Sequence, residues 1–308
     1  MKTHEFLNMF RERKLLVITD DNAITDLFRK HGFTDFADFA DFDFAANTDP
    51  VFVLLSTYPS QYRMNKELWD NCGGIFVHLA AAKFDGSLQA VDYSIQKILD
   101  IPDYAATLAH RDVLYEKALS AKLINIHSGE NSVLTGVLAE EVEVANYDAE
   151  LEEGWLYSIA EFFETSIVNL ADNKSSFCVD GKLVFNGLSY LENSPELKTE
   201  FAPLLTEMVN LSVKGDNWLE CQDNSITKMV LGGQDFTAKM NEAFADSIRG
   251  LSLTEFAFGV VNHPKMPDWR INSIMNEGIV GMHVGIGIAV DTSHVDFISA
   301  GARLEFVH

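Results

Sequence analysis

The side chains best suited to holding a metal ion are concentrated near the end of the chain. Carboxylates and imidazoles recur between positions 255 and 296 of an apolar, glycine-rich stretch, as Glu255, Glu277, His283, His294 and Asp296. Carboxylate oxygen and imidazole nitrogen suit divalent zinc, cobalt, manganese or iron. Burying so many ionisable groups is costly unless they are paired or bind a metal. The pattern therefore predicts a centre for one or two divalent ions and leaves the element open.

The spacing of His294 and Asp296 would let both side chains reach one ion. They are two residues apart, so on a strand they project from one face while Val295 and Phe297 project from the other. Each short motif also has a simpler explanation. An isolated His-x-Asp is often a surface pair, and an isolated His283 is often a half-buried histidine. Their concentration in one stretch favours the metal centre.

From about His127 to its end, the chain resembles the thermophilic-aminopeptidase family of metallopeptidases, typified by aminopeptidase T, and especially its short single-chain members. The similar segments occur in the family's order: IHSGENSVLTGVLAEEVEV, YSIAEFFETS, VDGKLVFNGLSYL, LTEFAFGVVNHP, NEGIVGMHVGIG and SHVDFI. The last three are similar to the family's Glu-Leu-Gly-Ile-Gly-x-Asn-Pro signature, its Glu-x5-His segment and its terminal His-x-Asp. The second is similar to the Pro-Gly-Glu segment and aligns Glu161 with the family's glutamate.

This resemblance implies a metal-dependent hydrolase that cleaves a peptide or small amide, and a homodimer paired through its C-terminal domains. It implies metal ligands at Glu255, Glu277, His283, His294 and Asp296, with Glu161 and Glu277 as catalytic carboxylates. The chain departs from the family in three respects. Val290 stands where larger members have a tyrosine, Ile159 and Ala160 replace the proline and glycine, and the loop between the two histidines is shorter.

In such a hydrolase, bound metal lowers the pKa of a water molecule and polarises the scissile carbonyl. We expect His294 and Asp296 to anchor one ion, while Glu255 and His283 complete the site. Glu277 would either bridge two ions or, without a metal bond, act as the general base.

Two further histidines are candidates for substrate binding. His263 precedes Pro264, although a histidine in a turn before proline is an equally good explanation. His78 lies late in a predicted strand, and ligands of open α/β sheets lie outside the carboxyl ends of the strands. A core histidine bonded to the backbone is the simpler alternative for His78.

The same fold also resembles that of the 2,5-dihydroxypyridine dioxygenases, which hold a single iron with two histidines and an aspartate. In that group a histidine takes the place of Glu255, which favours the hydrolase. A two-histidine, one-carboxylate site for Fe(II) could still form from His283, His294 and Asp296. A mononuclear Fe(II) ring-cleaving dioxygenase is therefore the alternative. A third hypothesis is a non-catalytic peptide-binding or biosynthetic accessory protein on the same fold, suggested by Val290 and the shorter loop.

Strand and helix patterns alternate in the first part of the chain, which predicts a small α/β domain over residues 1–125. Its strands are expected at 14–20, 49–57 and 73–81, and its helices at 22–33, 87–100 and 106–121. Short β-rich segments dominate afterwards, with helices expected at 197–210 and 236–250. Residues 126–308 are thus expected to form an α+β, β-rich domain that carries the metal site.

Composition and charge limit the partners. The 308 residues are 47% hydrophobic, as in a globular protein. The chain has 46 acidic and 23 basic side chains, and the net charge of −23 argues against nucleic acid and anionic membranes as partners. The charge is explained by solubility or, alternatively, by attraction of a cationic peptide or amine. The partner expected from the resemblance is a small-molecule or peptide substrate. Without a signal core or a long apolar run, we expect a soluble, cytoplasmic protein. The widely spaced Cys72, Cys178 and Cys221 are expected to be reduced thiols.

The segment 34–46 alternates phenylalanine with aspartate. It lacks the glycine and the terminal glutamate of a calcium-binding loop. We expect a partly buried connection that packs its rings against the sheet and leaves its carboxylates in water.

Overall fold

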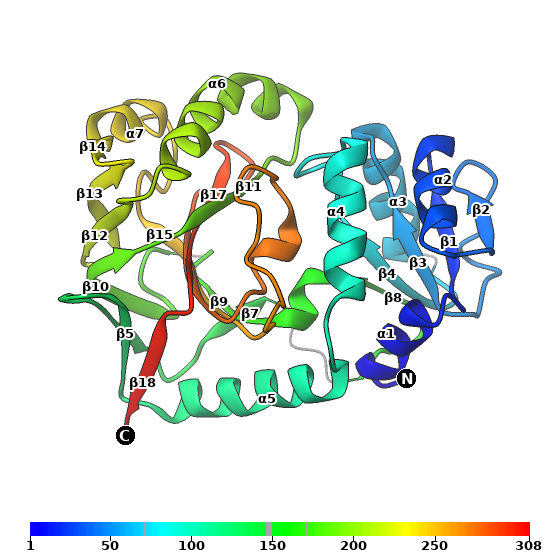
Figure 1. Cartoon of the computed structure of the whole chain (residues 1–308), viewed down its shortest axis with the longest axis horizontal. Helices are drawn as coiled ribbons and strands as arrows, with labels where there is room; N and C mark the ends of the chain where they lie inside the picture. Colours follow the sequence, from blue (N-terminus) through cyan, green and yellow to red (C-terminus); the bar gives the residue numbers. More distant parts are fainter. Residues whose placement is uncertain (71, 146–149, 171) are drawn as a thin grey trace.

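The computed structural model describes residues 1–70, 72–145, 150–170 and 172–308. Its strands form three sheets, with helices around them (Figure 1). The mixed α/β class predicted from the sequence is confirmed. The predicted boundary between residues 125 and 126 stays a prediction.

The first sheet is parallel, with five strands in the order β2-β1-β3-β4-β8. Their bounds, in the same order, are Phe36–Asp38, Leu16–Thr19, Val51–Leu54, Ile75–Leu79 and Trp155–Ser158. Strand β3 is buried along its whole length, as expected for a parallel strand covered on both faces. Three strands that belong to other sheets precede β8 in the sequence, so the chain returns to the first sheet after leaving it.

Apolar helix faces cover both sides of the first sheet. On one side, Phe6, Phe28 and Val91 pack with strand residues such as Phe52 and Val77. The helices on this side are α1 (Thr3–Arg11), α2 (Asn22–Lys30), α4 (Leu88–Leu99) and the start of α5 (Tyr104–Ser120). Helix α3 (Tyr58–Asp70) contributes Met64 to the core on the other side. Asp21, Ser87 and Asp103 accept hydrogen bonds from backbone N–H groups where α2, α4 and α5 begin.

The phenylalanine-rich segment packs as the sequence predicts, with one short strand inside it. Phe39 and Phe44 are buried in the same core as Met64, with their ring centroids 5.7 Å apart. Asp41 and Asp43 are exposed. The phenylalanine rings of this segment therefore pack against the first sheet, while its aspartates face solvent.

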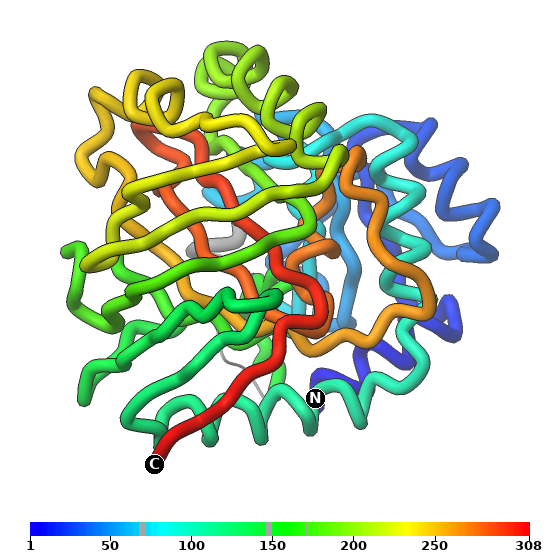
Figure 2. The backbone as a smooth tube through the Cα atoms, turned by 60° about the vertical axis from the view of Figure 1, so that its left-hand side comes forward, coloured from blue at the N-terminus to red at the C-terminus, as the bar shows by residue number. Residues whose placement is uncertain are grey.

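The second and third sheets are antiparallel and lie face to face (Figure 2). The second has the order β14-β13-β12-β10-β6-β5-β18, with bounds Gln234–Asp235, Ser225–Leu231, Trp218–Gln222, Phe177–Val184, Ser132–Leu138, Leu123–Gly129 and Arg303–Val307. The third has the order β11-β17-β16-β15-β9-β7, with bounds Gly187–Leu191, His294–Ala300, Gly281–Ile286, Leu253–Gly259, Glu164–Val168 and Glu143–Ala145.

Apolar side chains from both sheets form one core between them. Phe177 of the second sheet lies 5.6 Å from Phe256 of the third, and Phe185 lies 5.3 Å from Phe297, between ring centroids. This core determines which side chains of the third sheet point toward the second sheet. Because side chains alternate along a strand, it also determines which ones point to the opposite face.

The remaining helices connect or cap the sheets. Helix α5 runs along the bottom of the molecule in Figure 1, burying Leu108 in the core of the first sheet and Leu114 in the core between the other two. Helix α6 spans Pro195–Ser212 and α7 spans Thr237–Ala243. The expectation of a helix over 236–250 is therefore too long, because turns follow Ala243. No helix within the described residues is long and apolar enough to cross a bilayer.

We predict that Gly136→Ala destabilises the fold. A Cβ added at Gly136 would lie 2.6 Å from the ring of Phe256, so the two sheets could not keep their spacing. Overpacking of this kind costs about 1 to 3 kcal/mol in free energy of unfolding, measured by chemical denaturation. Val137→Ala is the control, because the neighbouring Val137 points outward and is exposed. Equal stability of the two variants would contradict the prediction.

Candidate metal centre

The candidate ligands lie on the face of the third sheet that is turned away from the sandwich core. On β17, Val295 and Phe297 point into that core, so His294 and Asp296 point to the opposite side. The same alternation on β15 and β16 places Glu255 and His283 on that side. The predicted strand geometry of His294 and Asp296 is thus present.

Antiparallel register brings these residues together across three strands. Asp296 of β17 pairs with Gly285 of β16, and Gly285 pairs with Glu255 of β15. A Cβ on Gly285 would lie 2.5 Å from Asp296 Oδ1, 2.8 Å from His294 Cε1 and 3.0 Å from Glu255 Cβ. The missing side chain at Gly285 therefore makes the space in which the three neighbours converge.

The first group of possible ligands is Glu255, His294 and Asp296. The Nε2 atom of His294 lies 3.1 Å from Glu255 Oε2 and 3.1 Å from Asp296 Oδ1. On the other side of the ring, Nδ1 lies 2.9 Å from the backbone oxygen of Gly287, which only a protonated Nδ1 can satisfy. This contact leaves Nε2 directed at the carboxylates, the arrangement that holds many metal-binding histidines.

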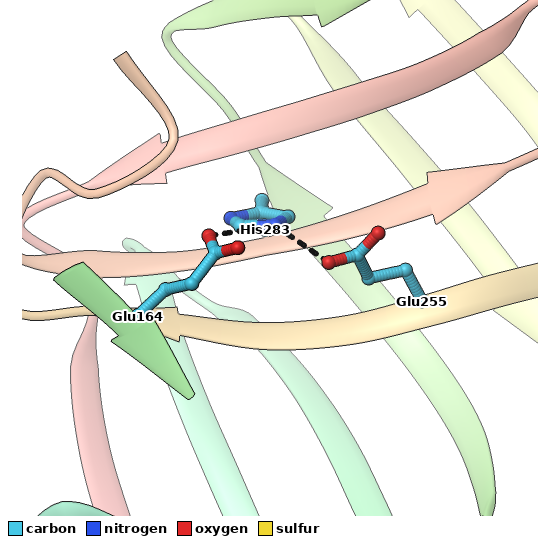
Figure 3. Close-up of side chains that lie close together, drawn as sticks. All are labelled: Glu164, Glu255 and His283. Atoms are coloured by element: carbon cyan, nitrogen blue, oxygen red, sulfur yellow. Dashed lines mark hydrogen bonds and ion pairs between the residues drawn. The ribbon is translucent and has the colours of Figure 1, made fainter. Parts of the chain in front are cut away.

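The second group is Glu164, Glu255 and His283, which point toward one another (Figure 3). It is more deeply buried than the first group. His283 lies between the two glutamates, with Nε2 at 3.4 Å from Glu255 Oε1 and 3.7 Å from Glu164 Oε2. The His283 side chain is 1% exposed, against 13% for His294. Glu255 belongs to both groups and directs one oxygen at each imidazole.

The donor set fits a divalent ion. Within each group the donor atoms lie within 4.8 Å of one another. Donors bound to one zinc ion at about 2.1 Å in tetrahedral geometry stand roughly 3.4 Å apart, close to the separations around His294. The buried oxygens Glu164 Oε2 and Asp296 Oδ1 contact only the imidazoles of His283 and His294 as ion pairs and accept no further hydrogen bond from the described residues, so a cation could take the place of the imidazole protons.

Glu277 lies beside the two groups and belongs to neither. It follows the short turn η2 (Ile274–Asn276), and its Oε1 accepts a hydrogen bond from the Ser189 hydroxyl on β11. The turn is tied to helix α4, because Tyr93 donates to Asn276 Oδ1 at 2.8 Å and the hydroxyls of Ser94 and Ser273 lie 2.7 Å apart. Contacts with the first sheet's helix thus set the position of Glu277.

The buried carboxyl groups differ in the direction of their pKa shifts. Burial, followed by the charges of Glu255 and Glu277, raises the pKa of Glu164 well above its ordinary value. Burial and Asp296 do the same to the pKa of Glu277. Burial also acts to raise the pKa of Glu255, but contacts with the two imidazoles outweigh it and leave that pKa low.

The imidazoles shift in the opposite direction. Burial lowers the pKa of His294, but the charges of Asp296 and Glu255 outweigh it and raise that pKa well above its ordinary value. Contact with Glu255 likewise raises the pKa of His283 against the effect of burial. Without metal the cluster can therefore balance its own charge, with protonated imidazoles beside Glu255 and Asp296 and neutral carboxyls at Glu164 and Glu277.

Other predicted site residues lie outside both ligand groups. Glu161 is in the turn η1 (Ala160–Phe163), three residues before Glu164. His263 is buried, and burial together with Lys97 of α4 lowers its pKa to about 4. Their proposed roles stay predictions.

His78 and Val290 also lie outside the ligand groups. The Nδ1 atom of His78 is buried without a hydrogen-bond partner among the described residues, near the carboxyl end of β4. Val290 is 68% exposed on the loop between β16 and β17. Its side chain therefore faces solvent at the position where the aminopeptidase family carries a tyrosine.

Sequence reasoning missed Glu164. The segment YSIAEFFETS contains both Glu161 and Glu164, and the resemblance aligned the first of them. In the structure Glu164 starts strand β9 and pairs with Gly259, which places its side chain on the ligand face. The one available signal was that Glu164, Ser166 and Val168 share a strand face.

Comparisons with known proteins address the family and the fold. A family model described as crocagin biosynthetic protein CgnE/B matches residues 12–307. Among solved structures, 2,5-dihydroxypyridine dioxygenase from Pseudomonas putida KT2440 is similar, with 11% identity, a TM-score of 0.50, and coverage of 99% of this chain and 94% of that one. No curated protein matches. These matches give the predicted aminopeptidase family no support, whereas the more distant resemblance to the dioxygenase fold is supported.

We predict that Gly285→Ala lowers zinc affinity at least tenfold, because the new methyl group would occupy the space between Asp296, His294 and Glu255. Isothermal titration of zinc into the protein measures the effect. Val137→Ala is the control, since Val137 is exposed on strand β6 of the second sheet. Zinc affinities that are alike in the two variants would contradict this view of Gly285.

We predict that His78 makes the fold sensitive to acid. Burial, with a smaller contribution from Lys83, lowers the pKa of His78 to about 3 from its ordinary 6.5. The unfolded chain therefore binds this proton first, and the stability it provides above pH 6.5 is lost as the pH falls towards 3. Between pH 7 and pH 5 the loss is about 2 kcal/mol.

Chemical denaturation at both pH values tests this effect of His78. The pH-dependent difference in free energy of unfolding should shrink by about that amount in His78→Gln. It should persist in His110→Gln, since His110 lies on the exposed side of α5. An unchanged difference in His78→Gln would show that His78 is not the source.

Proposed function

The chain belongs to the crocagin biosynthetic protein CgnE/B family, and on that premise we propose that it is a metal-dependent biosynthetic protein. Its metal centre would lie on the third sheet, between strands β17 and β9. The substrate would be a small molecule or a peptide, as the sequence predicts. The reaction class we favour is oxygen-dependent, because the similar fold belongs to a dioxygenase.

The observation that carries this proposal is the convergence of buried carboxylates and imidazoles, whose ion pairs within the described part of the chain are with one another. Glu164, Glu255 and Asp296 face His283 and His294 within two adjoining groups. A cluster this acidic is costly to bury unless cations or protons neutralise it. A divalent ion neutralises it while using the same donor atoms.

The ligand roles differ between the two groups. Glu255, His294 and Asp296 would hold the more accessible ion, because the His294 side chain is 13% exposed whereas that of His283 is 1% exposed. Glu164 and His283 would serve a deeper position, sharing Glu255. The two imidazoles belong to different groups, so the expected combination of His283, His294 and Asp296 on one iron is not the arrangement that we favour.

A metal held by the first group, Glu255, His294 and Asp296, would supply open positions at which oxygen and substrate are activated. The chain's own residues would do the rest. Glu277 can hold or release a proton beside the reacting atoms, since burial favours its neutral form and Ser189 fixes its orientation. The backbone oxygen of Gly287 keeps His294 in one tautomer, so that Nε2 remains a donor to the metal.

A second candidate is an accessory protein of the same pathway that performs no chemistry. The observation that favours it is the internal charge balance, in which imidazolium groups pair with Glu255 and Asp296 while Glu164 and Glu277 are neutral. In that state the cluster would be a structural ion-pair network with no metal.

Metal content separates the two candidates. Protein purified without added metal should carry between one and two divalent ions per chain, measured by elemental analysis. His294→Ala should lower the content by at least half, because it removes the donor that contacts both Glu255 and Asp296. His308→Ala, at the exposed end of β18, should leave it unchanged. Absence of metal, with no uptake of iron or zinc, would favour the accessory protein.

Oxygen consumption tests the reaction class. The iron-loaded protein should consume oxygen with at least one dihydroxylated aromatic or heteroaromatic compound, and His294→Ala should abolish that consumption. An electrode measurement with a panel of such compounds is sufficient. A metal-loaded protein that consumes no oxygen with any of them would contradict the dioxygenase proposal and leave the metal-binding proposal intact.

A further inference from the structure

The two carboxylate oxygens of Glu255 contact different imidazoles, and one of these oxygens also accepts a hydrogen bond from a serine. Oε2 contacts His294 at 3.1 Å, while Oε1 contacts His283 at 3.4 Å. The hydroxyl of Ser166 donates a hydrogen bond to Oε1. A glutamate side chain has several rotatable bonds, so a fixed division of its oxygens needs a partner that holds one of them.

Register places Ser166 where it can perform this role. Ser166 of β9 pairs with Ala257 of β15, and Glu255 lies two residues before Ala257 on the same face. The Ala257 methyl group carries no polar atom that could compete for the hydroxyl. Ser166 is 1% exposed, so water does not replace this hydrogen bond. A buried hydroxyl that donates to a carboxylate forms one of the stronger hydrogen bonds in proteins.

We propose that Ser166 is a positioning residue for the metal centre. It holds Oε1 of Glu255 on the side of His283, which leaves Oε2 for His294 and keeps the two ligand groups separate. This inference rests on the proposed function, because Ser166 acts on metal only through Glu255. Metal binding would then require the hydroxyl of Ser166 in addition to the ligand residues.

The chain provides a matched control at the neighbouring position. Thr165 is also 1% exposed, and its Oγ1 has no hydrogen-bond partner within the described residues. It pairs with Phe258, whose ring lies in the core between the sheets, so Thr165 faces away from Glu255. Thr165→Val removes a buried hydroxyl from the same strand at nearly constant volume.

Titration with Co²⁺, followed by its visible absorption, tests the proposal on the full chain. Ser166→Ala should lower Co²⁺ affinity about 10- to 100-fold, the usual effect of removing a hydrogen bond to a metal ligand, and should change the absorption band shape. Ser166→Thr, which keeps the hydroxyl, should recover most of the affinity. Thr165→Val should match the wild type. Thermal unfolding of the metal-free variants confirms that each is folded. Ser166→Cys, which has a similar shape and only a weak donor, replaces Ser166→Ala if the latter does not fold.

A double-mutant cycle separates positioning from general damage. In a Glu255→Ala background, Ser166→Ala should change Co²⁺ affinity less than twofold, because the side chain that Ser166 orients is gone. The proposal is overturned if Ser166→Ala behaves like Thr165→Val, if Ser166→Thr restores nothing, or if the loss is the same in both backgrounds. Failure of the wild type to bind Co²⁺ would instead remove the proposed function, and this inference with it.

Discussion

The burial of several carboxylates beside two imidazoles on one face of a sheet is the constraint on which this structure depends. Ionised carboxylates cannot stay in such a position without compensation, so protons or metal ions must be part of the folded state. Two ligand groups that share Glu255 offer a place for such ions. Gly285 leaves the volume that they need, because any side chain there would collide with Asp296, His294 and Glu255.

The sandwich of the second and third sheets makes this polar face possible. Phenylalanine rings such as Phe256 and Phe297 lock the third sheet against the second, and strand alternation then directs Glu255 and Asp296 to the other side. The apolar face of the third sheet is thus held in place by the second sheet, while its other face carries the candidate ligands. The chain belongs to the crocagin biosynthetic protein CgnE/B family, and its fold is similar to that of 2,5-dihydroxypyridine dioxygenase.

The first sheet contributes to the site through the turns that join it to the third. The chain passes from strand β8 through η1 directly to Glu164 at the start of β9. Helix α4 holds the turn that carries Glu277, through hydrogen bonds from Tyr93 and Ser94. The positions of Glu164 and Glu277 therefore depend on the first sheet and its helices, which contribute no candidate ligand of their own. A shift between these parts would move Glu164 and Glu277 relative to His283 and His294.

The sequence by itself determined which strand residues face the centre, because side chains alternate with a period of two and Val295 and Phe297 must enter the core. It also predicted the alternating helices and strands of the first sheet, whose patterns are local. Only the tertiary structure chose Glu164 over Glu161, left Glu277 outside both ligand groups, and divided the oxygens of Glu255 between two imidazoles. Those choices depend on register between strands distant in sequence and on turns held by other elements, and no local pattern encodes either.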